Sequence, residues 1–290
     1  MDDLVLHEGT RAQLQRFVAT PSHALMLIAP EGAGKRTVSL QLAKQVLQLR
    51  NLTELAKHPY FFLIEPDEGY QKIEAIRSLQ TCVRLKTPGS AAIRRVIIIE
   101  AAHTMTVQAQ NALLKLLEEP PVDTLIILNV AGRNNLLPTV YSRTQKIQLV
   151  PPAKELLLSA FTKKGYQAVA IESAYHLSGG QVGLLAALLE QDDSHPLTAH
   201  IAEAKRIFTM SQYERLSYVG KLVGKKPEIP ALLQAMQRIA RAALLQAGSH
   251  SRVADVACWH RRVRIINSVQ QRVVYNANSK LLLTSLLLEL

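Results

Sequence analysis

Residues 23–37 read H-A-L-M-L-I-A-P-E-G-A-G-K-R-T. An apolar run leads into a glycine-containing loop and then into a lysine that opens a helical pattern, which is the context of a phosphate-binding loop. Such a loop uses glycines so that backbone N–H groups can approach phosphate oxygens, a helix N-terminus that faces the anion, and a lysine that reaches the outer phosphates. The stretch therefore predicts a strand, a nucleotide site and a helix in succession.

The candidate nucleotide site consists of six consecutive residues: Gly32, Ala33, Gly34, Lys35, Arg36 and Thr37. The full pattern has Gly where Ala29 stands, and Ser or Thr directly after the lysine to hold Mg²⁺. Arg36 occupies that second position, and Thr37 comes one residue late. One residue turns a helix by about 100°, so we expect the Thr37 hydroxyl to point away from the metal and predict no metal site. ATP and ADP are the candidate ligands, and a vestigial turn that binds no nucleotide remains the alternative.

A second apolar run, Val96 to Ile99, is expected to be the strand that carries the catalytic carboxylates of a nucleotide hydrolase. Such a strand ends in Asp-Glu, which hold the metal and polarise the attacking water. Here it ends in Glu100-Ala101-Ala102-His103. Glu100 is one methylene longer than Asp, and Ala101 cannot polarise water. We interpret Glu100 as a paired or hydrated charge and His103 as an exposed residue, and we expect no intrinsic ATP hydrolysis.

Arg143 closes the segment N-N-L-L-P-T-V-Y-S-R at 134–143 and is the candidate catalytic residue. An arginine finger stands at a rigid surface position and places its guanidinium in a neighbour's site, where it neutralises charge on the transferred phosphoryl group. Pro138 and Ser142 provide such rigidity. The pattern alone fits a surface salt bridge equally well.

The rest of the chain divides at Pro151-Pro152. Before it, helical patterns at 35–50, 70–86 and 105–118 alternate with continuous apolar runs at 24–28, 60–64, 95–99, 124–129 and 146–149, as expected for strands of a parallel sheet buried on both faces. After it, only helical patterns follow, beginning with 154–164, 168–177 and 183–190. The predicted fold is an α/β core with a parallel sheet and flanking helices at 1–150, a small helical lid at 151–192, and an all-α C-terminal domain at 197–290.

Composition limits the kinds of partner and the location. The formal net charge of +11 favours anionic partners, and the aromatic content of 5% favours contact with a DNA backbone over base stacking. Cys82 and Cys258 are far apart and are expected to be small buried hydrophobic residues, so we predict no zinc and no disulfide framework. The N-terminal residues lack the pattern of a signal peptide, and no apolar run is long enough to span a membrane, which predicts a cytoplasmic protein.

Residues 58–143 resemble the clamp-loader branch of the AAA+ proteins. The likeness rests on H-P-Y-F-F-L-I-E-P-D-E-G at 58–69, M-T-V-Q-A-Q-N-A-L-L-K-L-L-E-E-P-P at 105–121 and L-L-P-T-V-Y-S-R at 136–143, and it extends to the C-terminal helix at 276–290. The resemblance implies an AAA+ core, a lid and a collar that joins subunits in a hetero-oligomeric ring. It also implies partners: ATP-hydrolysing motor subunits, a clamp-opening subunit, a sliding clamp and primer–template DNA.

The chain departs from the family pattern in several places. Thr144 replaces the cysteine that follows the finger arginine, a small change that should leave Arg143 in place. The four-cysteine zinc module of many members is absent from Leu47–Lys57, and no arginine stands at Gln181–Gly183, where the lid's sensor is expected. Asn129 lies near the expected first sensor. These losses favour a ring subunit that keeps the finger but does not hydrolyse ATP.

Two basic clusters have open interpretations. One could line the inner face of the ring and contact DNA phosphates, or be a solvated helix face; it comprises Lys72, Arg77, Arg84, Lys86, Arg94 and Arg95. The other, Arg261, Arg262 and Arg264, is interpreted as salt bridges across the collar. For the whole chain, the alternatives to an ATPase-deficient subunit are an ATP-hydrolysing motor subunit that uses Lys35 and Glu100, or a DNA-binding assembly protein with a vestigial nucleotide site.

Overall fold

A computed structural model describes residues 4–66, 73–83, 87–132, 136–192, 195–224, 228–249, 253–274 and 278–290. The chain forms two compact units, Met1–Leu157 and Leu158–Leu290. The first is an α/β unit and the second is helical. The boundary between them falls inside helix α7 (Lys154–Lys163).

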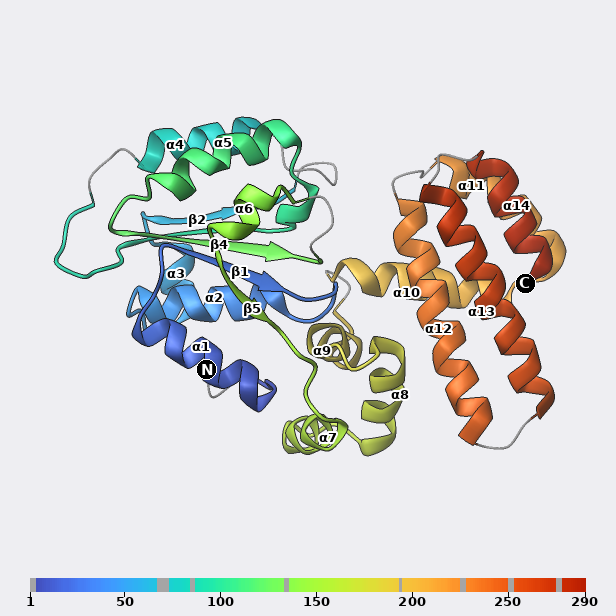
Figure 1. Cartoon of the computed structure of the whole chain (residues 1–290). Coiled ribbons are helices and arrows are strands. Elements are labelled where there is room, and N and C mark those ends of the chain that lie inside the picture. The colour runs from blue at the N-terminus through green and yellow to red at the C-terminus, as the bar shows by residue number, and fades with distance from the viewer. Residues whose placement is uncertain are drawn as a thin grey trace. The chain divides into compact units, whose positions relative to one another are not determined.

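One parallel sheet forms the centre of the α/β unit, with the strand order β2-β3-β4-β1-β5 (Figure 1). The strands are β1 (Ala24–Ile28), β2 (Phe61–Ile64), β3 (Arg95–Ile99), β4 (Thr124–Val130) and β5 (Gln145–Gln148). Every residue of β3 and β4 is buried, as expected for central strands with helices on both faces. The predicted parallel sheet is confirmed, and β1 and β3 have the predicted bounds.

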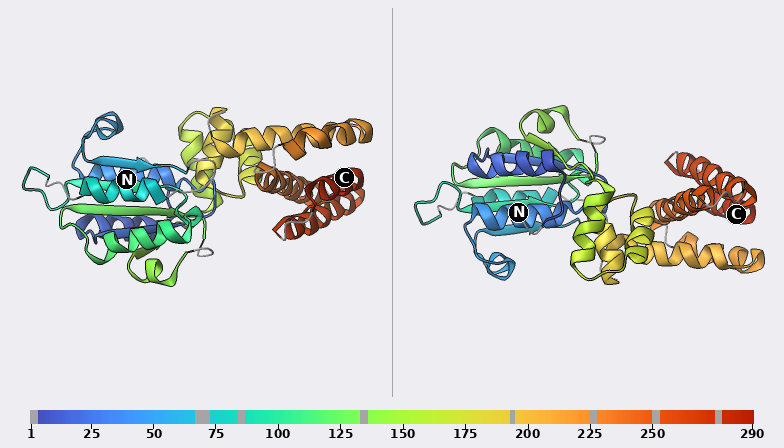
Figure 2. Two further views of the ribbon diagram at one scale, coloured as in Figure 1. Left: turned by 90° about the horizontal axis from the view of Figure 1, so that it is seen from above. Right: turned by 90° about the horizontal axis from the view of Figure 1, so that it is seen from below.

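Helices cover both faces of this sheet because successive strand residues point to opposite sides (Figures 1 and 2). Ala24 and Met26 pack in one apolar core with α4 (Ile73–Val83), α5 (Val107–Glu118) and α6 (Pro138–Ser142). Leu25 and Leu27 pack in a second core with α1 (Glu8–Ala19), α2 (Lys35–Val46) and α3 (Leu52–Ala56). This three-layer arrangement is the predicted α/β core.

Some helix bounds differ from the prediction for local reasons. The helix expected at 35–50 ends at Val46, and Gln48 adopts a positive φ of 55° before α3 begins. The helix expected to start at Met105 starts at Val107, because the Thr106 side chain accepts a hydrogen bond from the Ala109 N–H and caps it. A short 3₁₀ turn, Ala102–Thr104, precedes it. Helices α1 and α3 were not predicted.

The helical unit contains the end of α7 and α8 (Ala168–Ser178), α9 (Val182–Glu190), α10 (Pro196–Thr209), α11 (Gln212–Gly224), α12 (Ile229–Ser249), α13 (Val253–Val274) and α14 (Ser279–Glu289). One apolar core extends from Leu184 in α9 to Leu287 in α14. The predicted division of this part into a lid and a collar remains a prediction, since both lie in the same compact unit. Across the described ranges, no helix is both long and apolar enough for a membrane span.

The two cysteines were expected to be buried. Cys258 is instead exposed on α13, so this expectation is wrong. The side chain of Cys82 lies outside the described residues.

Candidate functional site

The candidate phosphate-binding loop connects β1 to α2 at the carboxyl edge of the sheet. Gly32 and Gly34 adopt φ values of 83° and 87°, which only glycine reaches readily, and Gly34 is the N-cap of α2. The helix therefore begins at Lys35 with its N-terminus at the loop. Both glycines fit the backbone conformation that a phosphate cradle needs.

The Lys35 ammonium group is folded back onto its own loop. Its Nζ donates hydrogen bonds to the carbonyl oxygens of Ala29 at 2.7 Å and Pro30 at 2.9 Å. Burial lowers the pKa of Lys35, while the nearby charges of Glu31 and Glu100 oppose that shift. The lysine that would reach a phosphate thus has two protein acceptors in this conformation.

Arg36 occupies the position after the lysine where an active phosphate loop has its metal-binding hydroxyl, and its side chain is already paired with a carboxylate. The Arg36 guanidinium forms an ion pair with Glu65, at the end of β2, and both side chains are about half exposed. Thr37 is exposed on α2, and the direction of its hydroxyl remains a prediction. These residues fit a phosphate group better than they fit Mg²⁺, since an arginine beside the loop repels a divalent cation.

Glu100 and Asn129 meet at the ends of adjacent strands. Asn129 is fully buried, and its Nδ2 donates to Glu100 Oε1 at 2.8 Å and to Ser39 Oγ at 3.0 Å. Burial raises the pKa of Glu100, against the lowering effects of the Asn129 hydrogen bond and of the charges on Arg36 and Lys35. The interpretation of Glu100 as a paired group agrees with this contact, and Asn129 links it to α2.

Ala101 and His103 complete the carboxyl edge. Ala101 adopts a positive φ of 46° and turns the chain away from β3. The expectation that His103 is exposed is wrong: it is partly buried, and its Nδ1 accepts a hydrogen bond from the Ala131 N–H at 3.2 Å. Burial also lowers its pKa. The local sequence could not show this contact, because Ala131 follows a different strand.

Arg143 lies at the C-terminus of α6, where its guanidinium has two contacts. Nη2 forms an ion pair with Glu118 Oε1 at 2.9 Å, and Nη1 donates to the Thr139 carbonyl at 3.2 Å. The Arg143 side chain is 37% exposed and that of Glu118 is 48% exposed. The salt bridge that the sequence left as an alternative therefore exists, at a surface position that solvent and other molecules can reach.

Buried contacts fix the backbone on which Arg143 stands. The Leu137 N–H donates to Gln110 Oε1 at 2.7 Å, and Gln110 is almost fully buried in α5. Val140 is buried against the same core, and the buried Thr144 hydroxyl donates to the Tyr141 carbonyl. The start of α6 is thus bonded to α5, its middle packs in the same core, and the end of α6 is closed by a local hydrogen bond, while the Arg143 guanidinium remains at the surface.

The predicted DNA-contact cluster is divided by the structure. Lys72, Arg84 and Lys86 lie outside the described residues, and Arg77 is exposed on α4. Arg95 is only 1% exposed, so neither of the two open interpretations, contact with DNA or a solvated face, holds for it. The sequence alone indicated an exposed charge for Arg95, because local patterns do not reveal a buried acidic partner from another part of the chain.

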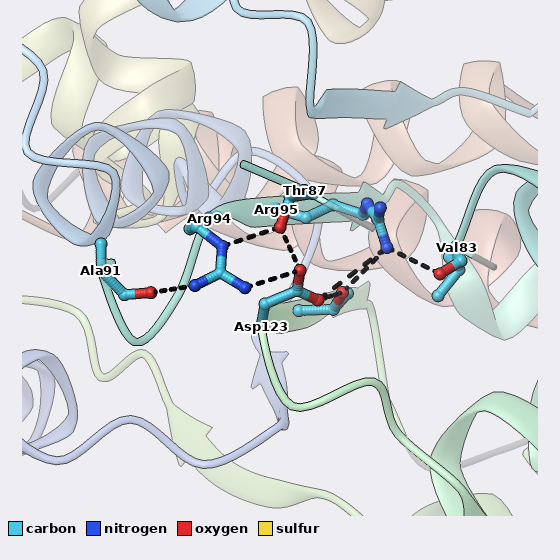
Figure 3. A network of polar contacts seen from close by, with 7 residues as sticks. Val83, Thr87, Ala91, Arg94, Arg95 and Asp123 are labelled. Atoms are coloured by element: carbon cyan, nitrogen blue, oxygen red, sulfur yellow. Dashed lines mark hydrogen bonds and ion pairs between the residues drawn. The ribbon is translucent and has the colours of Figure 1, made fainter. Parts of the chain in front are cut away.

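That partner is Asp123, at the amino edge of the sheet (Figure 3). Arg95 Nη1 donates to the Val83 carbonyl at 3.0 Å and lies 4.0 Å from Asp123 Oδ1. Arg94 donates to Asp123 Oδ2 at 3.3 Å, and the Thr87 hydroxyl bonds the same oxygen. Burial raises the pKa of Asp123, but the hydrogen bonds and the two guanidinium groups lower it more, so it lies below its ordinary value.

One group of potential metal ligands occurs in the described part of the helical unit. Ligand atoms of His200, Glu203 and Glu228 lie within 4.8 Å of one another. The Tyr218 hydroxyl donates to Glu203 at 2.7 Å, and the Arg206 guanidinium lies 4.8 Å from the Tyr218 ring centre. Glu203 thus already accepts a hydrogen bond in this arrangement. The expectation of no metal site remains a prediction.

Comparisons with known proteins place this geometry in a family context. Residues 9–153 match the family model described as "DNA polymerase III, delta subunit". The chain is 34% identical over 179 residues to DNA polymerase III subunit delta' of Pseudomonas aeruginosa, which covers 56% of this chain and 54% of that protein. It is 34% identical over 142 residues to subunit delta' of Bacillus subtilis, with coverages of 45% and 43%. The chain thus spans about half the length of the curated relatives that it matches.

A solved structure extends the fold comparison over almost the whole chain. A DNA polymerase III gamma subunit-related protein from Thermotoga maritima superposes with a TM-score of 0.54, covering 95% of this chain and 96% of that one. At 21% sequence identity this similarity concerns the fold alone. It agrees with the predicted order of an α/β core followed by helices.

Proposed function

The chain belongs to the DNA polymerase III delta subunit family, and from that membership we propose that it is a delta-prime-like clamp-loader subunit that lends Arg143 to the ATP site of a neighbouring subunit. It hydrolyses no ATP itself. Its proposed partners are the motor subunits and the clamp-opening subunit of a hetero-oligomeric ring in the cytoplasm, together with the sliding clamp and primer–template DNA.

The placement of Arg143 is the observation that carries this proposal. An arginine finger needs a rigid backbone and a guanidinium group that a neighbouring site can reach. The backbone around Arg143 is fixed by the hydrogen bonds of Gln110 and Thr144, and the guanidinium forms an ion pair with Glu118 at the surface. A surface ion pair is worth only about 0–1 kcal/mol, so phosphoryl oxygens can replace the Glu118 carboxylate at low cost. Glu118 then serves as the resting partner of the guanidinium.

The lack of intrinsic hydrolysis follows from the carboxyl edge of the sheet. Ala101 offers no carboxylate for the attacking water, and Glu100 is bonded to Asn129. Lys35 and Arg36 both have protein partners in place of phosphate and metal. The edge keeps the shape of a nucleotide site without the groups that activate water.

We expect the isolated chain to show no ATP hydrolysis above background in a steady-state phosphate-release assay. Lys35→Ala is the control, because it removes the group that reaches phosphate in an active loop. Turnover in the wild-type chain that Lys35→Ala abolishes would contradict the proposal and favour an ATP-hydrolysing motor subunit. The test does not depend on Arg143, so it can fail separately from the finger assignment.

Any nucleotide affinity should depend weakly on Mg²⁺, with a change of less than about tenfold, because Arg36 stands where the metal-binding hydroxyl belongs. Calorimetry with ADP or ATP, with and without Mg²⁺, measures this. Arg36→Thr restores a hydroxyl after the lysine and should increase the effect of the metal. A large Mg²⁺-dependent gain in the wild-type chain would show that Thr37 or Glu100 reaches the ion.

A further inference from the structure

The helical hairpin formed by α12 and α13 is strongly basic. Residues 229–274 contain seven arginines and a single acidic residue, Asp255. α12 and α13 pack against each other along their length, and a hydrogen bond joins Gln237 to Asn267. The hairpin therefore concentrates positive charge on one substructure of the helical unit.

Two of these arginines serve the packing of the unit itself. Arg238 Nη1 donates to the Ser178 carbonyl at 2.7 Å. Arg262 Nε donates to the Leu290 carbonyl at 3.1 Å, and its guanidinium lies 4.6 Å from the centre of the Trp259 ring. Arg262 thus has contacts within its own unit, and the interpretation of Arg261, Arg262 and Arg264 as salt bridges across the collar remains a prediction.

Three others form a row on the outer side of α13. Arg261, Arg264 and Arg272 are exposed, and none has an ion pair or side-chain hydrogen bond with any residue in the described ranges. Their spacing of three and eight residues places them on one helical face over a rise of roughly 16 Å. We call this row the α13 arginine row.

The same face is hollowed. A depression of about 330 Å³ is lined by Ala257, His260, Arg261, Arg264, Ile265 and Ser268. Two arginines of the row are among its lining residues. No carboxylate of the described residues lines it, so a negative group entering the depression meets positive or neutral side chains there.

We propose that the α13 arginine row binds the phosphate backbone of a nucleic acid. Arginine forms paired hydrogen bonds with phosphate oxygens, and a row along one helix matches a series of evenly charged groups. An acidic protein helix fits less well, because protein interfaces need a continuous apolar centre and the apolar side chains of this face are Ala257, the half-buried Ile265 and, at the start of α13, the exposed Val253. The row carries no aromatic side chain, so contact is with the backbone rather than through base stacking.

The proposal is independent of the finger. It needs neither ATP nor a second subunit, and the intact chain can be tested alone. Labelled duplex DNA and single-stranded DNA of the same length are the two probes, and binding is followed by fluorescence anisotropy between about 50 and 200 mM salt.

The test variant is Arg261→Gln/Arg264→Gln/Arg272→Gln. We expect a loss of roughly a thousandfold in affinity at about 50 mM salt that shrinks to below about a hundredfold at about 200 mM, because the slope of log K against log salt is smaller by about 3 for duplex DNA, each lost phosphate contact removing about 0.9. The probe that loses more affinity identifies the bound form. Replacing the same three residues by lysine should preserve most of the binding, because lysine also contacts phosphate as a point charge.

The matched control removes three other exposed cations of the helical unit, through Lys163→Gln/Lys205→Gln/Lys280→Gln. It has the same net charge as the test variant and should keep the wild-type salt slope. Equal slopes for test variant and control would overturn the proposal. So would a polyglutamate peptide that binds the wild-type chain more tightly than either DNA at the same salt, because the row would then serve a protein partner.

Discussion

Replacing Arg143 by alanine is expected to lower the ATPase and clamp-loading rates of a reassembled clamp loader while the variant chain still folds and assembles. An arginine finger contributes roughly 10³–10⁵ in rate where it serves the only site. The proposed subunit completes one of several sites in a ring, so the bulk loss is smaller than that range. Clamp- and DNA-dependent ATP hydrolysis by complexes rebuilt with each variant measures it.

The structure explains why folding should survive. Removing the guanidinium breaks only the surface ion pair with Glu118 and one hydrogen bond to Thr139, while the buried contacts of Gln110 and Thr144 remain. Arg143→Lys should rescue little, since lysine lacks the planar fork of donors. The finger effect is therefore separable from charge and from stability.

Arg16→Ala is the matched control, because Arg16 is another exposed arginine near a helix end of the α/β unit. Equal assembly of all complexes is checked by gel filtration before rates are compared. Wild-type rates for Arg143→Ala would refute the finger assignment and leave the family membership untouched. The chain would then have a structural role in the ring.

Replacing Asp123 by alanine is expected to lower the free energy of unfolding by about 3 kcal/mol. Removing one partner of a buried ion pair leaves the other charge uncompensated, and Arg95 is only 1% exposed. Arg94 and Thr87 lose the same partner. Urea unfolding of the two proteins measures the difference.

Glu119→Ala is the control for this loss, because Glu119 is an exposed carboxylate of the same unit and should change stability by less than about 0.5 kcal/mol. The pKa of Asp123 is lower in the folded chain, so its stabilisation is complete above the ordinary value of 3.8 and is lost as the pH falls through the folded pKa. If Asp123→Ala unfolds like Glu119→Ala, the network contributes little.

The sequence predicts those parts of the fold that short-range patterns determine. β1 is an apolar run between His23 and the loop that starts at Ala29-Pro30, and β3 is an apolar run between Arg95 and Glu100, so their ends could be placed to the residue. The start of α2 follows from the glycine loop, in which Gly34 is the cap. α1 was missed because its buried side chains, Leu14 and Phe17 among them, are too few to form an apolar stripe.

The residues of the candidate site likewise fall into those that the sequence could predict and those that it could not. The residues of the phosphate loop could be predicted from their spacing, since one backbone turn positions them all. The pairing of Arg143 with Glu118, and of Arg95 with Asp123, joins residues about 25 to 28 positions apart, on different elements. Such contacts depend on how helices and strands pack, and no local pattern encodes them.

The start of α2 also has a consequence for folding. Lys35 and Arg36 place two cations in the first turn, which contains no acidic residue, at the end of a helix that prefers negative charge. Glu65 offsets this mismatch for Arg36, and loop carbonyls do so for Lys35. The protein thus compensates both cations in the absence of a ligand, and a phosphate that lodged at this turn would stabilise the folded chain by mass action as well as occupying a site. Phosphate binding and folding would then be coupled at a single turn of helix.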